Sequence, residues 1–182
     1  MMITSRIKST VLMAFTVPLI AMAAEPATTK KLSAQQVKLN ADVIAETQAN
    51  RLFMQSFVEF INTADVKLAS ELVSPKAIFY VPGRAEPVSG PAGYLDIIHM
   101  MRSGFPDIQW TLEETVAEGD KVVARFTMRG THLGAFFGVP ASGKKIAVQA
   151  LNIYRFAGGQ IIEERGQPDL LDLMRQIGAI PK

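Results

Sequence analysis

The sequence predicts an α+β fold, with helices in its first half and an antiparallel sheet in its second half. Up to about Gly104 apolar residues recur every three to four positions, which is typical of amphipathic helices. After Gly104 they alternate with polar residues, and tight turns at 118–121 and 157–159 separate the alternating runs. Helices followed by such a meander argue against a doubly wound sheet, and no glycine-rich phosphate loop follows a predicted strand.

The composition limits the kind of protein this is. A length of 182 residues favours one domain, and 48% hydrophobic with 20% charged residues predicts a packed core. The absence of cysteine excludes disulfides, thiolate metal sites and a cysteine nucleophile. Two histidines cannot supply a multi-histidine zinc site, so we expect no metal and no cofactor. A net charge of +2 is not the basic excess of a nucleic-acid binder.

Residues 1–23 predict a secretory signal. Arg6 and Lys8 precede an uncharged apolar run over residues 11–23, which ends in the small residues of a cleavage site, Ala21-Met22-Ala23. The run is shorter than the ~20 residues of a membrane-spanning helix, and a retained anchor is the disfavoured alternative. Cleavage would remove both excess positive charges. We expect a neutral mature protein, exported to a bacterial periplasm without a stable membrane anchor and without nucleic acid as a partner.

The predicted helices follow from their caps and apolar spacing. Residues 24–32 predict a flexible lead-in to a domain over 33–182, which opens with the capping pair Ser33 and Gln36 and a helix to about Ile61. A short second helix covers residues 65–73. The third runs from Pro91 to near Gly104 and the last over 170–176, closed by Gly178. The inward stripe of the third helix is Tyr94, Ile97, Ile98 and Met101.

The predicted strands follow from runs of β-forming residues. The first covers residues 76–81, between the second and third helices. Alternation then predicts four strands, over about 108–116, 122–129, 146–156 and 160–166. The inward rows predicted for three of them are Ile108, Trp110, Leu112 and Val116; Val122, Ala124, Phe126 and Met128; and Ile146, Val148, Ala150, Asn152, Tyr154 and Phe156.

Several stretches of the second half resemble the SnoaL-like polyketide cyclases, a group also described as ester cyclases within the nuclear-transport-factor-2-like superfamily. The matching stretches, which span about 90–180, are Phe105-Pro106-Asp107, residues 117–125, Gly130-Thr131-His132-Leu133-Gly134, Phe137-Gly138-Val139-Pro140, residues 152–156 and residues 167–171. The chain departs from the group in one strand, where Glu163-Glu164-Arg165 stands in place of a frequent Glu-His-Trp.

The resemblance implies a cone-shaped α+β barrel, in which a curved antiparallel sheet wraps around helices and leaves an apolar pocket. It also implies a homodimer formed through the sheet. Characterised cyclases of the group close a ring by intramolecular aldol chemistry without metal or cofactor, using an acidic side chain in the pocket. The resemblance therefore implies a small hydrophobic carbonyl compound as the ligand.

Two polar residues stand out as candidates for pocket chemistry. Asn152 is a lone amide in an apolar row, so it is either a hydrogen-bond donor in the pocket or a buried residue satisfied by backbone. Asp169 precedes the last helix, and it is either the acid–base group or the N-terminal cap of that helix. Gln149 falls on the opposite strand face from Asn152, so both face one cavity only if a bulge intervenes.

A polar row on the last predicted strand offers further candidates. Alternation places Glu163, Arg165 and Gln167 on one face with Ile161. Glu163 is a candidate catalytic acid, and Arg165 and Gln167 are candidate ligand contacts on a pocket wall. The alternative is a solvated ion pair, or one at a dimer seam.

Two histidines and two aromatic residues complete the candidates. His99 flanks the third helix's apolar stripe, as a general base or an exposed residue. His132 belongs to the resembling Gly-Thr-His-Leu-Gly stretch and shapes a loop or contacts the ligand. Tyr80 and Trp110 either stack on a substrate or pack in the core. The apolar loop 136–140 covers the pocket or packs at the edge of the fold.

Three functions remain open from the sequence. The first is an exported enzyme that cyclises or isomerises a hydrophobic carbonyl compound by cofactor-free acid–base chemistry. The second is a periplasmic protein that binds such a molecule without converting it. The third is an interaction module that uses the sheet face, with Trp110 in the contact surface.

Overall fold

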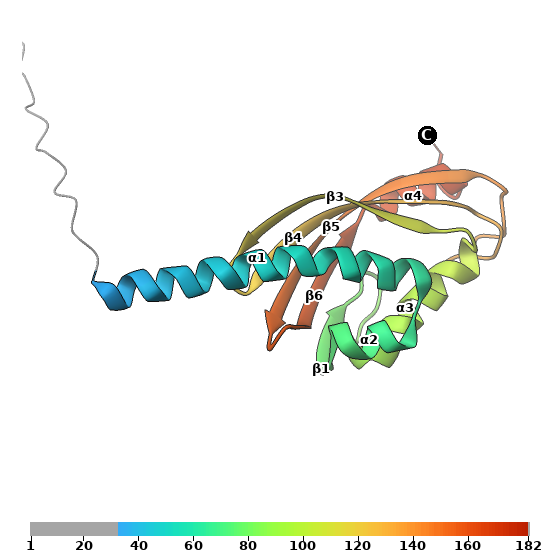
Figure 1. Cartoon of the computed structure of the whole chain (residues 1–182). Coiled ribbons are helices and arrows are strands. Elements are labelled where there is room, and N and C mark those ends of the chain that lie inside the picture. The colour runs from blue at the N-terminus through green and yellow to red at the C-terminus, as the bar shows by residue number, and fades with distance from the viewer. Residues whose placement is uncertain (1–32, 182) are drawn as a thin grey trace, which may run out of the picture. The chain divides into compact units, whose positions relative to one another are not determined.

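The computed structural model describes residues 33–181, which belong to one compact unit. The predicted signal over 1–23 and the lead-in over 24–32 lie outside the described residues. Four helices and one six-stranded sheet make up the unit, and α1 and α3 lie on the same side of the sheet (Figure 1). The α+β class and the curved sheet wrapped around helices are thereby confirmed.

The helices begin and end close to their predicted limits. They are α1 (Ala34–Thr63), α2 (Val66–Leu72), α3 (Gly90–Gly104) and α4 (Leu170–Ile177). Ser33 caps α1 by accepting a hydrogen bond from the Gln36 backbone, as predicted, and Gly178 ends α4 in the left-handed conformation. Within the described range, none of these helices combines the length and apolarity that crossing a membrane requires.

The sheet differs from the prediction in three respects, the first of which is an additional two-residue strand over residues 88–89. Its strands are β1 (Val73–Tyr80), β2 (Val88–Ser89), β3 (Gln109–Glu118), β4 (Lys121–Thr131), β5 (Lys145–Ala157) and β6 (Gln160–Pro168). They pair in the order β2-β1-β6-β5-β4-β3, and β1 runs parallel to β6, so the sheet is mixed rather than antiparallel. The predicted barrel is also wrong, because the end strands β2 and β3 do not pair with one another and the sheet stays open.

Two bulges interrupt the regular alternation of side chains. In β6, Phe156 pairs with Ile161 while Arg155 pairs with Glu163, so Ile162 is an extra residue without a cross-strand partner. In β3, Glu113 is extra in the same way. Each extra residue moves the side chains beyond it to the opposite face of the sheet. The inward placement predicted for Val116 is therefore wrong: its side chain is 61% exposed.

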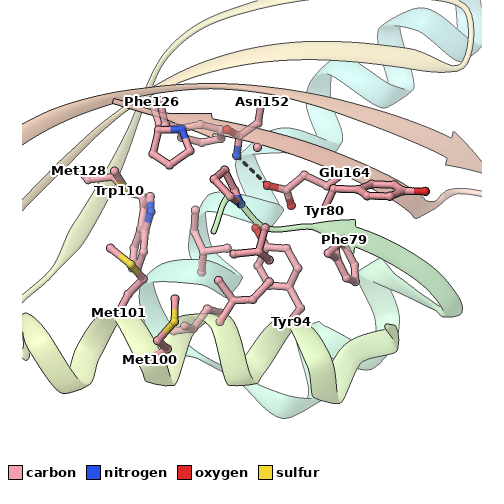
Figure 2. Close-up of a pocket in the computed structure, with 18 of the residues that line it drawn as sticks. Phe79, Tyr80, Tyr94, Met100, Met101, Trp110, Phe126, Met128, Asn152 and Glu164 are labelled. Carbon is pink, nitrogen blue, oxygen red and sulfur yellow. Dashed lines mark hydrogen bonds between the residues drawn. The ribbon is translucent and has the colours of Figure 1, made fainter. Parts of the chain in front are cut away.

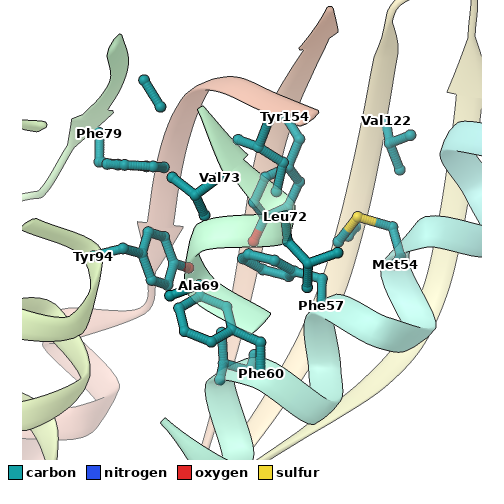
Figure 3. Packing of buried hydrophobic residues seen from close by; sticks show 14 of the residues in the cluster. Met54, Phe57, Phe60, Ala69, Leu72, Val73, Phe79, Tyr94, Val122 and Tyr154 are labelled. Atoms are coloured by element: carbon teal, nitrogen blue, oxygen red, sulfur yellow. The ribbon is translucent and has the colours of Figure 1, made fainter. Parts of the chain in front are cut away.

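The main core fills the space between the sheet and helices α1, α2 and α3. Aromatic rings dominate it, and Phe57 packs edge-on against both Tyr94 and Tyr154 with ring centroids 5.4 and 5.2 Å apart (Figure 3). The predicted apolar stripe of α1 is responsible for this contact, since Phe57, Phe60 and Ile61 are all buried. A second cluster lies under α4, which buries Leu173 and Ile177.

Asn62 joins the end of α1 to the free edge of the sheet. Its side-chain amide donates to the Trp110 carbonyl at 2.9 Å, and its side-chain oxygen accepts from the Trp110 backbone N–H at 2.8 Å. Arg102 of α3 donates in turn to the Asn62 carbonyl at 2.7 Å. One carboxamide thereby makes the two hydrogen bonds that a neighbouring strand would make at this position.

Replacing Asn62 by alanine should destabilise the fold by about 2 kcal/mol, because two part-buried backbone groups of Trp110 lose their partners. Urea denaturation measures this loss. Asn40→Ala, an exposed site on the same helix, is the matched control and should change the free energy of unfolding little. Equal stability of the two variants would contradict the role given to Asn62.

Candidate functional site

A predominantly apolar cavity of about 110 Å³ lies between α3 and the inner face of the sheet. The predicted stripe of α3 forms one wall through Tyr94, Ile97 and Met101, and β4, β5 and β6 form the opposite wall. Polar side chains gather at one end, around Asn152 and Glu164, while Trp110, Met100 and Met101 lie at the other (Figure 2). The arrangement suits a ligand that is apolar over most of its surface.

Glu164 is the acid of this cavity. The β6 bulge places it on the inner face, directly across from Tyr154, and only 7% of its surface is exposed. The Asn152 amide donates to its Oε1 at 2.7 Å. Its Oε2 is buried and has no hydrogen-bond partner among the described residues. A buried carboxyl oxygen without a partner beside a cavity is free to bind or deprotonate a ligand.

Asn152 is held in place from two further directions. Its side-chain nitrogen also donates to the Tyr154 hydroxyl at 3.1 Å, and its side-chain oxygen accepts from the Gln167 backbone N–H at 3.3 Å. Because the side-chain oxygen of Asn152 bonds the Gln167 backbone, its side-chain nitrogen is the atom that faces Glu164. Both interpretations open for Asn152 match part of this geometry. It borders the cavity and donates to Glu164 there, and its side-chain oxygen bonds a backbone N–H.

The surroundings of Glu164 alter its acidity. Burial raises the pKa of its carboxyl from an ordinary 4.5 to about 7, and the nearby hydroxyls of Tyr94 and Tyr154 together with the Asn152 hydrogen bond offset part of that rise. Burial, followed by the nearby Glu164 charge, raises the pKa values of Tyr94 and Tyr154 well above 10. Both tyrosines therefore stay protonated near neutral pH, while Glu164 can exchange a proton there.

Three of the predicted site residues border the cavity. They are Asn152, Trp110 and Tyr80. Trp110 is half-buried and turned towards the helices, so it does not belong to an exposed contact surface on the outer face of the sheet. Tyr80 borders the cavity, but the residue is 39% exposed and its ring stacks against the Arg165 guanidinium, which lies 4.0 Å from the ring centroid.

The other six lie outside the cavity lining. Asp169 is exposed and accepts the Asp172 backbone N–H at 2.8 Å, which is the capping arrangement. His99 is exposed on α3. Glu163 and Arg165 pair at 2.8 Å on the outer face, where the bulge has turned them. Gln167 is also exposed and contributes only its backbone N–H, to Asn152.

His132 is fully buried away from the cavity. Its Nδ1 lies 3.0 Å from the Ser142 hydroxyl, and its ring packs on Phe105. This contact joins the two ends of the loop between β4 and β5, as the loop-shaping interpretation expects. Across residues 33–181, no three histidine or acidic side chains gather in a way that could hold a metal ion.

Sequence reasoning missed Glu164 as the site acid. Strict alternation from Ile161 places Glu163 inward, and only the extra residue Ile162 reverses that assignment. The available signal was the pair of consecutive apolar residues Ile161-Ile162, which breaks the alternating pattern where a bulge would. The apolar spacing places Tyr94 and Tyr154 inward, but as core residues only.

The raised pKa of Glu164 predicts a pH-dependent stability. Between about pH 4.5 and 7 the folded protein binds more protons than the unfolded chain, so stability should fall by about 3 kcal/mol as the pH rises. Glu164→Gln should remove this slope in chemical denaturation measured across that range. Glu163→Gln, on the outer face, should retain the pH dependence. If the stability of the Glu164 variant still falls with pH as in the wild type, the buried carboxyl is not the source of the slope.

Comparison with known proteins agrees with the resemblance seen in the sequence. A family model described as SnoaL-like polyketide cyclase matches residues 51–177. The aklanonic acid methyl ester cyclase DnrD of Streptomyces peucetius is 27% identical over 130 residues, which cover 69% of this chain and 88% of DnrD. TsrD from Streptomyces laurentii is 30% identical with a TM-score of 0.65, covering 73% of this chain and 97% of TsrD.

A second solved structure supports the same assignment. A protein from Jannaschia sp. CCS1, described as a putative SnoaL-like polyketide cyclase, is 27% identical with a TM-score of 0.67 and covers 75% of this chain and 96% of its own. The match to the family model extends from the middle of α1 to the last residue of α4, and so includes every strand of the sheet. The chain therefore belongs to the SnoaL-like polyketide cyclase family.

Proposed function

We propose that this protein binds a small hydrophobic carbonyl compound in the cavity and cyclises or isomerises it by acid–base catalysis without a cofactor. The observation that carries the proposal is the Glu164 carboxyl, buried in an apolar cavity with a pKa of about 7 and one oxygen unpaired. A group with that pKa is available both as a base and, once protonated, as an acid near neutral pH.

The geometry suggests a division of roles. Asn152 holds Oε1 of Glu164, so the unpaired Oε2 is the atom that takes a proton from the carbon beside the ligand's carbonyl. Hydrogen-bond donors are then needed for the enolate oxygen. The tyrosine hydroxyls of Tyr94 and Tyr154, which remain protonated, are next to Glu164 and are the candidates for that task.

The chemistry balances without an oxidant or reductant. In a ring closure the enolate carbon bonds to a second carbonyl carbon of the same molecule, and the resulting alkoxide takes back the proton that Glu164 removed. Substrate and product are then isomers. The name of the relative DnrD, an aklanonic acid methyl ester cyclase, supports this class of reaction.

A second candidate is a protein that binds the same kind of ligand without converting it. The observation that favours it is that Glu164 is the sole carboxyl among the cavity-lining residues described here. One group would then have to act as both base and acid, whereas binding needs only the apolar walls and the Glu164–Asn152 pair. The enzyme and the binding protein would bind the same class of ligand, and only the enzyme would convert it.

Glu164→Gln should abolish proton exchange while leaving binding measurable. The assay follows, by NMR in deuterated buffer, loss of the α-proton signal of a β-keto ester bearing an aromatic ring. The wild type should exchange the α-proton faster than buffer alone does. In the variant the exchange rate should fall by at least about a hundredfold, which is the contribution typical of a general base. Glu163→Gln is the matched control and should exchange normally. Wild-type protein that binds the ester without exchanging it would support the binding protein instead.

The proposal includes export. Its support lies in the order of charged, apolar and small residues over 1–23, and cleavage after Ala23 would remove none of the residues that the structure describes. N-terminal sequencing of the protein recovered from the periplasm of an expressing bacterium should begin at Ala24. Recovery from the cytoplasm with Met1 in place would contradict export while leaving the chemistry of the cavity open.

A further inference from the structure

The loop between β4 and β5 contains a two-residue turn whose first residue, Phe137, is of a type that disfavours the backbone conformation it adopts there. Phe136 and Val139 exchange two backbone hydrogen bonds, of 3.0 and 2.9 Å, around Phe137 and Gly138. Both central residues have positive φ, 45° and 78°, which is the combination of a type I′ turn. Asparagine, aspartate or glycine normally occupies the first position, because a bulky side chain in the left-handed region is strained.

The loop is nevertheless held firmly in place. The backbone N–H groups of Leu133 and Gly134 both donate to the Gly104 carbonyl at 3.0 Å, which ties the loop to the end of α3. Gly134 packs so closely there that a Cβ would overlap the Ser103 carbonyl oxygen. At the base of the loop, the contact between His132 and Ser142 closes it. These contacts anchor the loop on both sides of Phe137.

The Phe137 ring also lacks the burial that would repay its strain. It is 53% exposed, although it borders the cavity and lies 4.5 Å from the Phe136 ring, centroid to centroid. Phe136, by contrast, is 4% exposed and belongs to the second apolar cluster. The strained backbone holds an exposed aromatic ring at the rim of an apolar cavity, and a bound ligand would remove that exposure.

We propose that Phe137 is a ligand-binding residue, which packs against the part of a ligand that extends out of the cavity. This inference rests on the proposed function, because it presupposes that the cavity binds an aromatic carbonyl compound. At about 110 Å³ the cavity is on the scale of the ~150 Å³ hole that holds a single benzene ring, so it has room for about one ring and no more. A compound with two fused rings that places its carbonyl near Glu164 must therefore reach the rim, where Phe137 contacts it.

Two probes of different length test the proposal on the full chain. They are acetophenone, with one ring, and 2-acetylnaphthalene, with two. Their binding is followed by ligand-observed NMR and by fluorescence quenching of Trp110, the chain's single tryptophan, which borders the cavity. Phe137→Asn should weaken binding of the two-ring probe about tenfold and leave the affinity for the one-ring probe nearly unchanged, since only the two-ring probe stacks on the Phe137 ring. The loss of one aromatic pair accounts for a change of that size.

Stability provides an independent readout that separates binding from folding. Phe137→Asn should unfold at the same temperature as the wild type or a few degrees higher, because asparagine adopts the left-handed backbone more readily. Phe137→Trp should retain affinity for the two-ring probe. Leu133→Asn is the control: it lies on the same loop and is 57% exposed, but it does not border the cavity.

The outcomes distinguish this inference from the proposal beneath it. Selective weakening of the two-ring probe by Phe137→Asn, with Leu133→Asn unchanged, supports the role of Phe137. Equal affinity of the Phe137 variant and the wild type for both probes overturns it and leaves the cavity function standing. Failure of both probes to bind wild-type protein overturns both proposals, because no aromatic ketone then enters the cavity. Failure of the two-ring probe alone overturns only the role of Phe137.

Discussion

The candidate site depends on one extra residue in an otherwise regular strand. Ile162 has no partner on β5, and its insertion turns Glu164 inward and sends Glu163 and Arg165 to the outer face. Had β6 continued in register, a carboxylate and a guanidinium would face the aromatic core, where unpaired charge is costly. The bulge instead admits a single carboxyl, and Asn152 across the strand pair supplies its hydrogen bond. The chemistry of the cavity is therefore a consequence of strand register.

The aromatic core and the cavity are parts of one packing arrangement. Tyr94 and Tyr154 pack against Phe57 with their rings and face Glu164 with their hydroxyls, so the same side chains fill the core and line the site. Because these rings are buried, the carboxyl beside them is shielded from water, and its raised pKa follows. The methionines and Trp110 at the other end leave that wall adaptable and apolar.

Periodicity was sufficient to predict most of the fold and only part of the site. Helix limits, the inward rows of β4 and β5 and the place of Asn152 follow from local spacing and capping, which depend on neighbouring residues. Glu164 and the exposure of Val116 could not be predicted in this way, because a bulge changes the face of every residue beyond it and depends on how two strands pair. The parallel pairing of β1 with β6 is a long-range contact that no local pattern records.

The contact between Asn62 and Trp110 also protects one point on the open edge of the sheet. An open sheet exposes unpaired backbone groups along its end strands, and such edges recruit strands from other chains. At β3 a side chain from α1 already occupies the donor and the acceptor of Trp110, so an incoming strand finds no partner there. A helix thereby provides at one point the protection that barrel closure would otherwise give, and the sheet can remain open without leaving this stretch of its edge available for intermolecular pairing.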